Sequence, residues 1–151
     1  MTDLTLELAE PPSAEDSRLL LDGVRTFNRE RTGNERPRHV AYFLRAADGK
    51  ILGGVQGMLW GRSLHIDVLW VDESLRGQGL GSKLMKAIEN YGAKHNCPLL
   101  YLETASFQAL PFYKSLGYRI FGELPEISEG HKLFFLQKEL NAGSAQLEDV
   151  T

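Results

Sequence analysis

Three glycines lie within five residues in the stretch ESLRGQGLGSKLM, residues 73–85. They are Gly77, Gly79 and Gly81, and each costs conformational entropy on folding, so their spacing needs a reason. A helical pattern follows directly. The free amides at the start of a helix, with the helix dipole behind them, suit phosphate groups. The stretch therefore predicts a phosphate-binding loop, with a tight strand-to-helix turn that binds no ligand as the alternative.

Two common nucleotide-binding motifs do not fit these glycines. The Walker loop, G-x-x-x-x-G-K-[ST], requires a second glycine where this chain has Ser82. The dinucleotide fingerprint, G-x-G-x-x-G, requires a third glycine where the chain has Ser82 or Leu84, depending on the starting residue. The spacing therefore disfavours nucleotide hydrolysis and hydride transfer.

A different pattern fits. Residues 76–81 read [QR]-x-x-G-x-[GA], after the strand-like run SLHIDVLWV and before the helical pattern. A second pattern, A-x-x-F-Y-x-x-x-G-[FY], lies downstream within FQALPFYKSLGY, residues 107–118. With both patterns in this order, the sequence resembles the GNAT superfamily of acyl-CoA-dependent N-acetyltransferases over residues 41–138.

The resemblance implies a reaction and a cofactor site. The acetyl group of acetyl-CoA, the co-substrate, would move to a primary amine of a small molecule, or of a protein or peptide, by direct attack in a ternary complex. No metal is implied. A non-catalytic module that binds or senses acyl-CoA is the alternative. The implied cofactor-binding residues are Trp70, Val71, Arg76, Gly77, Gln78, Gly79, Leu80, Gly81, Ser82, Gln108, Phe112 and Tyr113.

The resemblance also implies roles in the transition state. The backbone N–H of Val71 would stabilise the developing oxyanion. Tyr113 would act as the acid that hydrogen-bonds to the departing thiolate, although its place near an apolar face also suits a core residue. The pantetheine arm would fill a gap between the strand ending at Val71 and the strand over residues 99–104. Gln108 or Ser106 would help to hold it, with a water-facing polar residue as the alternative for Gln108.

The acceptor amine must lose a proton, because an ammonium group has no lone pair. Asp67 is the first candidate for general base or amine anchor, since on an alternating strand it shares a face with Leu69 and Val71. His65 lies on the same face and has a suitable ordinary pKa. A chain of water molecules is a third possibility, and both side chains also suit an ordinary sheet surface.

Two segments give opposing indications about the acceptor. Glu123, Glu126 and Glu129, in or beside the predicted loop PEISEG, would attract a cationic amine unless they form an ordinary solvated loop. The arginine-rich residues 27–38 suit a carboxylate-bearing acceptor instead. A free amine on a small metabolite is the central prediction, and a polyamine, a protein lysine or an N-terminus stays open.

The helices and strands that must position these residues are predicted from hydrophobic periodicity and from the proline and glycine residues that end them. They combine into an α/β fold with a mixed sheet of about seven strands flanked by helices. The resemblance implies that this is the GNAT-like fold of acyl-CoA N-acyltransferases, in which the sheet is mostly antiparallel. One domain is expected over residues 1–140, with a flexible tail over residues 141–151 that lacks a core pattern. The expected elements are a strand over residues 4–10, a helix capped by Ser13, strands over residues 39–46, 51–60 and 63–71, a helix between Gly79 and Pro98, a strand over residues 99–104, a short helix closed by Gly117, and strands over residues 118–124 and 131–140.

Composition limits the other classes of function. The formal net charge of −3 over 151 residues argues against a nucleic-acid-binding protein, which would usually show a basic face. No apolar run reaches the length of a membrane span, and the N-terminus lacks a secretory pattern. A lone cysteine, Cys97, suits neither an internal disulfide nor a metal site, so a cytoplasmic protein is expected. A homodimer formed through the last strands is compatible with KLFFLQK.

Overall fold

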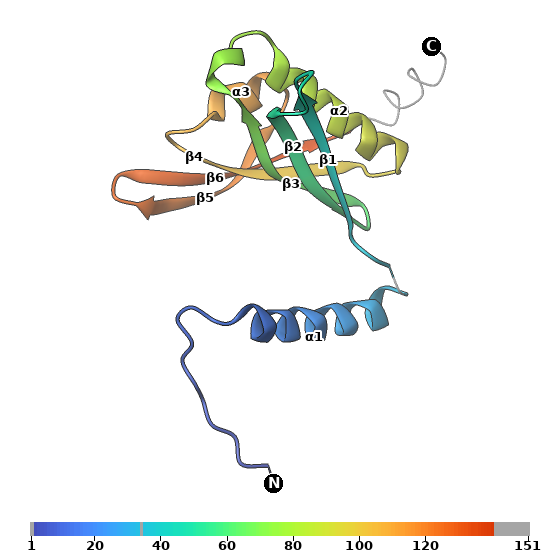
Figure 1. Ribbon diagram of the computed structural model, residues 1–151, viewed down its shortest axis with the longest axis vertical. Helices are drawn as coiled ribbons and strands as arrows, with labels where there is room; N and C mark the ends of the chain where they lie inside the picture. Colours follow the sequence, from blue (N-terminus) through green and yellow to red (C-terminus); the bar gives the residue numbers. More distant parts are fainter. Residues whose placement is uncertain (1, 34, 141–151) are drawn as a thin grey trace. The chain divides into compact units, whose positions relative to one another are not determined.

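The computed structural model describes residues 2–33 and 35–140 (Figure 1). The chain divides into two compact units, Met1–Arg36 and Pro37–Thr151. The predicted tail over residues 141–151 lies outside the described residues. Within those residues, no helix combines the length and the apolar character needed to cross a lipid bilayer.

The first unit contains the predicted helix, α1 (Ala14–Thr32). Ser13 caps it, since its side-chain oxygen accepts a hydrogen bond of 3.0 Å from the Asp16 N–H. Gly33 ends it in a left-handed conformation, with its N–H donating to the Arg29 carbonyl. Sequence patterning therefore identified this helix and its N-terminal cap correctly.

The strand predicted over residues 4–10 is wrong, because the structure has no strand there. The alternating side chains of Leu4, Leu6 and Leu8 are all more than four-fifths exposed. Alternation indicates which face of a strand would be buried, but a strand also needs a neighbour for its backbone hydrogen bonds. The described part of this unit contains a helix and no strand, so residues 4–10 have no partner strand within the unit.

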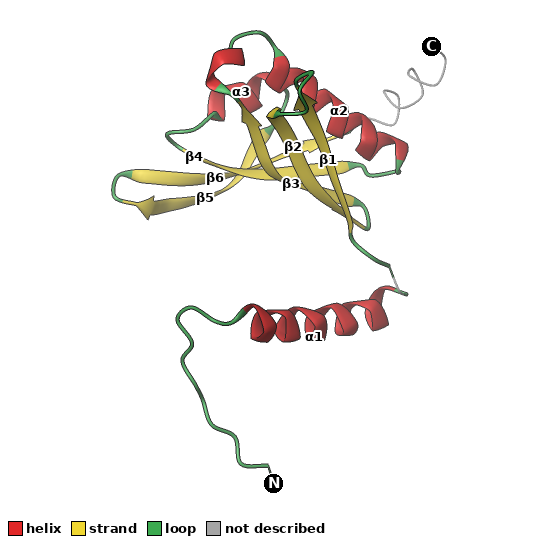
Figure 2. Cartoon of the chain, in the orientation of Figure 1, coloured by secondary structure: helices red, strands yellow, loops and turns green. Residues whose placement is uncertain are grey.

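The second unit is a six-stranded open sheet with helices (Figure 2). The strand order is β1-β2-β3-β4-β6-β5, and all neighbours are antiparallel except β3 and β4. The prediction of a mixed, mostly antiparallel sheet is confirmed, with six strands in place of about seven. The elements are β1 (Arg38–Arg45), β2 (Ile51–Trp60), β3 (Ser63–Val71), a 3₁₀ turn (Glu73–Leu75), α2 (Leu80–Lys94), β4 (Leu99–Ala105), α3 (Leu110–Ser115), β5 (Arg119–Ser128) and β6 (His131–Glu139).

The core of this unit joins α2 to the sheet. Leu84 and Ile88, four residues apart on α2, are buried together with Leu64 of β3 and Leu100 of β4. Leu136 of β6 completes this fully buried group. Because the apolar stripe of α2 is fixed against the sheet, the N-terminus of the helix is held in place after the glycine loop.

The last hairpin differs from its prediction. Residues 125–130 were expected to form a loop, whereas β5 continues to Ser128 and only Glu129 and Gly130 form the turn. β5 lies at the edge of the sheet, where a proline such as Pro125 is tolerated, and the register shifts between Leu124 and Ser128. The expected acidic loop is therefore largely a strand.

The sheet opens into a fork between β3 and β4. The two strands pair only from Ser63 opposite Leu99 to Ile66 opposite Leu102. Beyond Ile66, β3 continues to Val71 without β4 as a neighbour, and β4 continues to Ala105. The fork leaves one backbone edge of β3 free, as the resemblance implied.

Candidate active site

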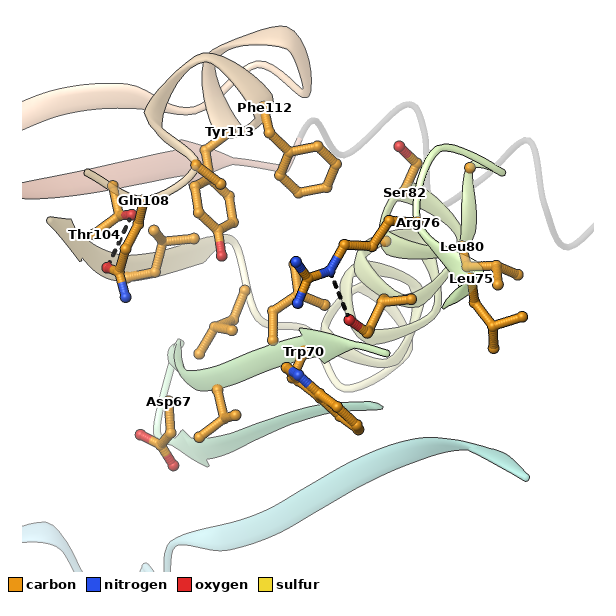
Figure 3. Close-up of a pocket in the computed structure, with 18 of the residues that line it drawn as sticks. Asp67, Trp70, Leu75, Arg76, Leu80, Ser82, Thr104, Gln108, Phe112 and Tyr113 are labelled. Atoms are coloured by element: carbon orange, nitrogen blue, oxygen red, sulfur yellow. Dashed lines mark hydrogen bonds between the residues drawn. The ribbon is translucent and has the colours of Figure 1, made fainter. Parts of the chain in front are cut away.

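A cavity of about 900 Å³ extends from the fork to the start of α2 (Figure 3). This size suits a cofactor-sized ligand. The cavity is lined by residues 66–71 of β3, residues 102–104 of β4, residues 75–77 and 79–82 of the glycine loop and α2, and residues 108, 109, 112 and 113 before and within α3. Eleven of the twelve residues predicted to bind the cofactor are among them, and Gln78 is not.

The glycine loop has an open surface. Gly77 and Gly79 have φ angles of +77° and +78°, which side-chain-bearing residues rarely adopt. A Cβ atom at either position would meet no heavy atom within 4 Å, so their lack of side chains leaves free space. Gly81 differs, since its Cβ would lie 3.3 Å from the Phe112 ring. The first two glycines set the backbone conformation and the third permits packing against α3.

Arg76 connects the loop to the end of β3. Its Nε donates a hydrogen bond of 3.0 Å to the carbonyl oxygen of Val71 (Figure 3). Among the residues that the structure describes, neither terminal nitrogen of this guanidinium group has a hydrogen-bond partner. The two terminal NH2 groups of a permanent cation therefore stay available beside the N-terminus of α2, where the helix dipole also favours an anion.

Tyr113 combines a buried ring with an available hydroxyl group. The residue is 9% exposed, and its ring packs edge-on against Phe112 and Tyr118, at centroid distances of 5.2 and 6.1 Å. The hydroxyl group points into the cavity and has no partner within residues 2–33 and 35–140 (Figure 3). Burial raises the pKa of Tyr113 above its ordinary value, so the phenol is a neutral donor at neutral pH. The ring therefore fits the interpretation as a core residue, and the role of the hydroxyl group as an acid stays a prediction.

The two polar residues considered for the pantetheine arm have different positions. Gln108 lines the cavity, and its Oε1 accepts hydrogen bonds from the Ala105 N–H at 2.7 Å and the Thr104 hydroxyl at 3.4 Å (Figure 3). Ser106 does not line the cavity, and its hydroxyl accepts from the Lys132 N–H at 3.1 Å. The structure therefore favours Gln108 of the two.

The candidates for general base belong to a cluster of three side chains. The Nδ1 of His65 lies 2.8 Å from Oδ1 of Asp67, and its Nε2 lies 2.6 Å from Oε2 of Glu103. Asp67 and Glu103 line the cavity, whereas His65 is not among the lining residues. Sequence reasoning missed Glu103, although the alternation of LLYLET puts it on the face of Tyr101. Its meeting with His65 depends on the pairing of β3 with β4, which no local pattern specifies.

One of the three acidic residues of the last hairpin has a cationic partner within the protein. Glu123 forms an ion pair of 2.9 Å with Lys132, and both side chains are exposed. The arginine-rich residues 27–38 lie mainly in the first unit.

Comparison with known families gives an independent result. A model of the acetyltransferase (GNAT) family matches residues 4–118 of the chain. The match includes the glycine loop, the fork and Tyr113.

Individual proteins agree with the family match. Blasticidin-S acetyltransferase from Streptomyces morookaense is 39% identical over 97 residues, which are 61% of this chain and 68% of that protein. An acetyltransferase structure from Bacillus cereus is 34% identical with a TM-score of 0.75, and the similarity covers 89% of this chain and 98% of the other. A structure from Bacillus anthracis in complex with acetyl coenzyme A shares the fold at 21% identity, with a TM-score of 0.61 and coverage of 70% and 65%.

Proposed function

The chain belongs to the acetyltransferase (GNAT) family, and we propose that it transfers the acetyl group of acetyl-CoA to a primary amine by direct attack in a ternary complex. One observation carries this proposal. A single cavity joins a helix N-terminus, the hydroxyl group of Tyr113, whose ring is buried, and a forked pair of strands. The complex of the Bacillus anthracis protein with acetyl coenzyme A supports the choice of cofactor.

The glycine loop and Arg76 would hold the phosphate end of the cofactor. The open space over Gly77 and Gly79 admits an anion close to the backbone, and the amides at the start of α2 point donors toward it. Acetyl-CoA supplies the activated acetyl group when it is bound. The free edge of β3 beyond Ile66 offers hydrogen-bonding groups to an extended, amide-rich chain.

Tyr113 would stabilise the departing thiolate. Its neutral hydroxyl donates a hydrogen bond as negative charge develops on sulfur, and its buried ring fixes the direction of the donor. The Val71 N–H as oxyanion donor stays a prediction, supported by the place of Val71 on the cavity wall. Asp67, His65 or a water chain would take the proton of the amine.

A free amine on a small molecule remains the preferred acceptor. The Streptomyces relative carries the name of a small molecule, blasticidin S, in its own name. A non-catalytic acyl-CoA-binding module is the alternative. Such a module has no need for an unpartnered hydroxyl group at the cavity, so Tyr113 favours the enzyme.

Substitution of Tyr113 by Phe tests this function. We expect Tyr113→Phe to lower kcat in a thiol-release assay by about 100-fold or more, and to leave the dissociation constant for acetyl-CoA within about twofold. Tyr42→Phe, at a partly exposed position of β1 outside the cavity, is the matched control. A Tyr113→Phe enzyme with the parent's rate across pH would eliminate the tyrosine acid. An absence of thiol release from the parent with a wide range of amines would favour the binding module.

A further inference from the structure

The Tyr113 hydroxyl group is carried by a very short helix. α3 has six residues, and its N-terminal cap is Ala109, which has no polar side chain. A helix of this length is not stable on its own, so contacts with other elements must fix it. The hydroxyl group points into the cavity and has no partner in the described part of the chain (Figure 3). Its direction is therefore set by what the ring and the backbone of Tyr113 contact.

Phe112 provides one contact between α3 and α2. A Cβ at Gly81 would lie 3.3 Å from the Phe112 ring, so this ring packs on the backbone of the first turn of α2. The contact joins α3 to the glycine loop. A single contact of this kind fixes a distance but leaves a short helix free to rotate about it.

Tyr118 provides the second contact, because it holds Tyr113 in two ways. Its N–H donates a hydrogen bond of 3.1 Å to the Tyr113 carbonyl oxygen. Its ring packs edge-on against the Tyr113 ring, with a centroid distance of 6.1 Å and an interplanar angle of 75°. Tyr118 is 3% exposed, so its ring cannot move without opening the core. Any shift of Tyr118 is therefore passed directly to Tyr113.

The hydroxyl group of Tyr118 is bound to α2. It donates a hydrogen bond of 3.0 Å to Oε1 of Glu89, a buried residue of the helix that follows the glycine loop. Lys138 Nζ donates to both oxygens of this carboxylate, at 3.1 and 3.0 Å, which fixes the carboxylate and balances its charge. Neither Glu89 nor Tyr118 is among the residues that line the cavity, so the roles assigned above do not use them. Buried polar groups that are partnered in this way favour one arrangement over its alternatives.

We propose that Tyr118 is a positioning residue for the Tyr113 hydroxyl group, and that its hydrogen bond to Glu89 fixes Tyr113 relative to α2 and to a cofactor bound at the start of that helix. This inference rests on the proposed function, since it concerns the tyrosine that would stabilise the departing thiolate. A displacement of about 1 Å at a reacting centre can cost about 100-fold in rate, so the loss of one such contact should be measurable.

Coenzyme A and desulfo-coenzyme A, which lacks the sulfur atom, test this inference without an acceptor amine. Burial raises the pKa of Tyr113 above 10, so at pH 9 its hydroxyl group is protonated, whereas thiols are partly ionised. A well-directed hydroxyl group then donates to the thiolate of coenzyme A and finds no such acceptor in the analogue. Calorimetry of the full-length protein gives the ratio of the two dissociation constants, which we define as the sulfur preference.

Three variants and one control locate the origin of the sulfur preference. Tyr118→Phe removes only the hydroxyl group that binds Glu89, at a position where the pattern G-[FY] admits phenylalanine. We expect the sulfur preference to fall about tenfold in Tyr113→Phe, as for one hydrogen bond to a charged group, and about threefold in Tyr118→Phe. In Tyr113→Phe/Tyr118→Phe it should equal that of Tyr113→Phe, because Tyr118 acts only through Tyr113. Tyr91→Phe, at a partly buried position of α2 outside the cavity, should keep the parent's value.

These measurements distinguish a positioning role from a merely structural one. The dissociation constant for desulfo-coenzyme A should stay within about twofold of the parent's in Tyr118→Phe, since the glycine loop is unchanged. A sulfur preference of Tyr118→Phe equal to the parent's would overturn the inference. A further fall when Tyr118→Phe is added to Tyr113→Phe would also overturn it, because Tyr118 would then act on the cavity by another route.

Failure of the proposed function gives different results with the same samples. A parent that binds neither ligand would refute the assignment of the cavity to the cofactor, and the inference with it. A parent whose sulfur preference is unchanged by Tyr113→Phe would refute the tyrosine acid itself. A fall in Tyr113→Phe with no fall in Tyr118→Phe would refute only the positioning role of Tyr118.

Discussion

A buried ion pair connects α2 to the last strand, and its removal should be costly. Both carboxylate oxygens of Glu89 accept hydrogen bonds from Lys138 Nζ, at 3.1 and 3.0 Å, and the Tyr118 hydroxyl donates to Oε1 at 3.0 Å. The Glu89 side chain is 8% exposed and that of Lys138 is 26% exposed. Loss of Lys138 leaves the Glu89 carboxylate shielded from water, with the Tyr118 phenol as its one remaining side-chain partner among the described residues.

The expected magnitude follows from this burial. Removal of one partner of a fully buried pair costs about 3–5 kcal/mol. Because Lys138 is a quarter exposed, water partly compensates for its loss, and we expect Lys138→Met to lower the free energy of unfolding by about 2–3 kcal/mol. For a protein of this size this corresponds to a fall in Tm of roughly 4–12 °C. Methionine keeps much of the apolar stem, so the lost charge dominates the effect.

Urea denaturation measures the effect and a second ion pair controls for it. Lys132→Met breaks the pair with Glu123, in which the side chains are 54% and 41% exposed, and should cost less than about 1 kcal/mol. A double-mutant cycle with Glu89→Gln should give a coupling energy above about 1 kcal/mol between Glu89 and Lys138. Equal stabilities of Lys138→Met and Lys132→Met would refute the argument from burial.

Three further predictions concern the cradle, the sheet and alkaline pH. Gly79→Asp, which adds a negative charge to the cradle, should weaken acetyl-CoA binding by more than about tenfold in calorimetry, and an unchanged affinity would mean that the cradle is elsewhere. Gly57→Ala should cost about 1–3 kcal/mol in urea denaturation because its Cβ would press on the His65 carbonyl, and a neutral result would show that β2 can move. Burial raises the pKa of Tyr113 and Tyr118 above 10, so above about pH 10 the unfolded chain loses these protons first. The free energy of unfolding should then fall by up to about 1.4 kcal/mol per pH unit for each tyrosine, and constant urea midpoints from pH 9 to 11.5 would contradict this.

The strands of the second unit could be predicted well because turn residues and alternating apolar residues mark them within short stretches of sequence. The Asp48–Gly49 pair marks the first hairpin, and Gly49 has the positive φ angle of +86° that such a turn requires. The strands over residues 51–60 and 63–71 have their predicted bounds. The prediction of a strand over residues 4–10 was wrong because a strand depends on more than its local pattern. Its alternating leucines describe a face, but a strand also needs a partner, which a local pattern cannot supply.

In the candidate site, too, residues marked by a local pattern could be predicted, and residues that depend on strand pairing could not. The glycine loop and Tyr113, which the structure brings to one cavity, could be singled out from the sequence because each belongs to a short pattern with a fixed spacing. Glu103 was missed because its role depends on a residue of another strand, 38 positions earlier. The prediction of Asp67 as an isolated candidate was incomplete for the same reason. Parallel pairing of β3 with β4 brings these residues together, and neither strand's own sequence records that pairing.

The most direct test of the central claim is thermal unfolding of the purified protein with acetyl-CoA, with NADH and ATP as controls. A ligand at about one hundred times its dissociation constant adds roughly 2.7 kcal/mol to the free energy of unfolding, which is a rise in Tm of about 5–10 °C for a protein of this size. We expect that rise with acetyl-CoA and little change with NADH or ATP. An unchanged Tm at millimolar acetyl-CoA, or an equal rise with ATP, would contradict the assignment of the glycine loop to the cofactor.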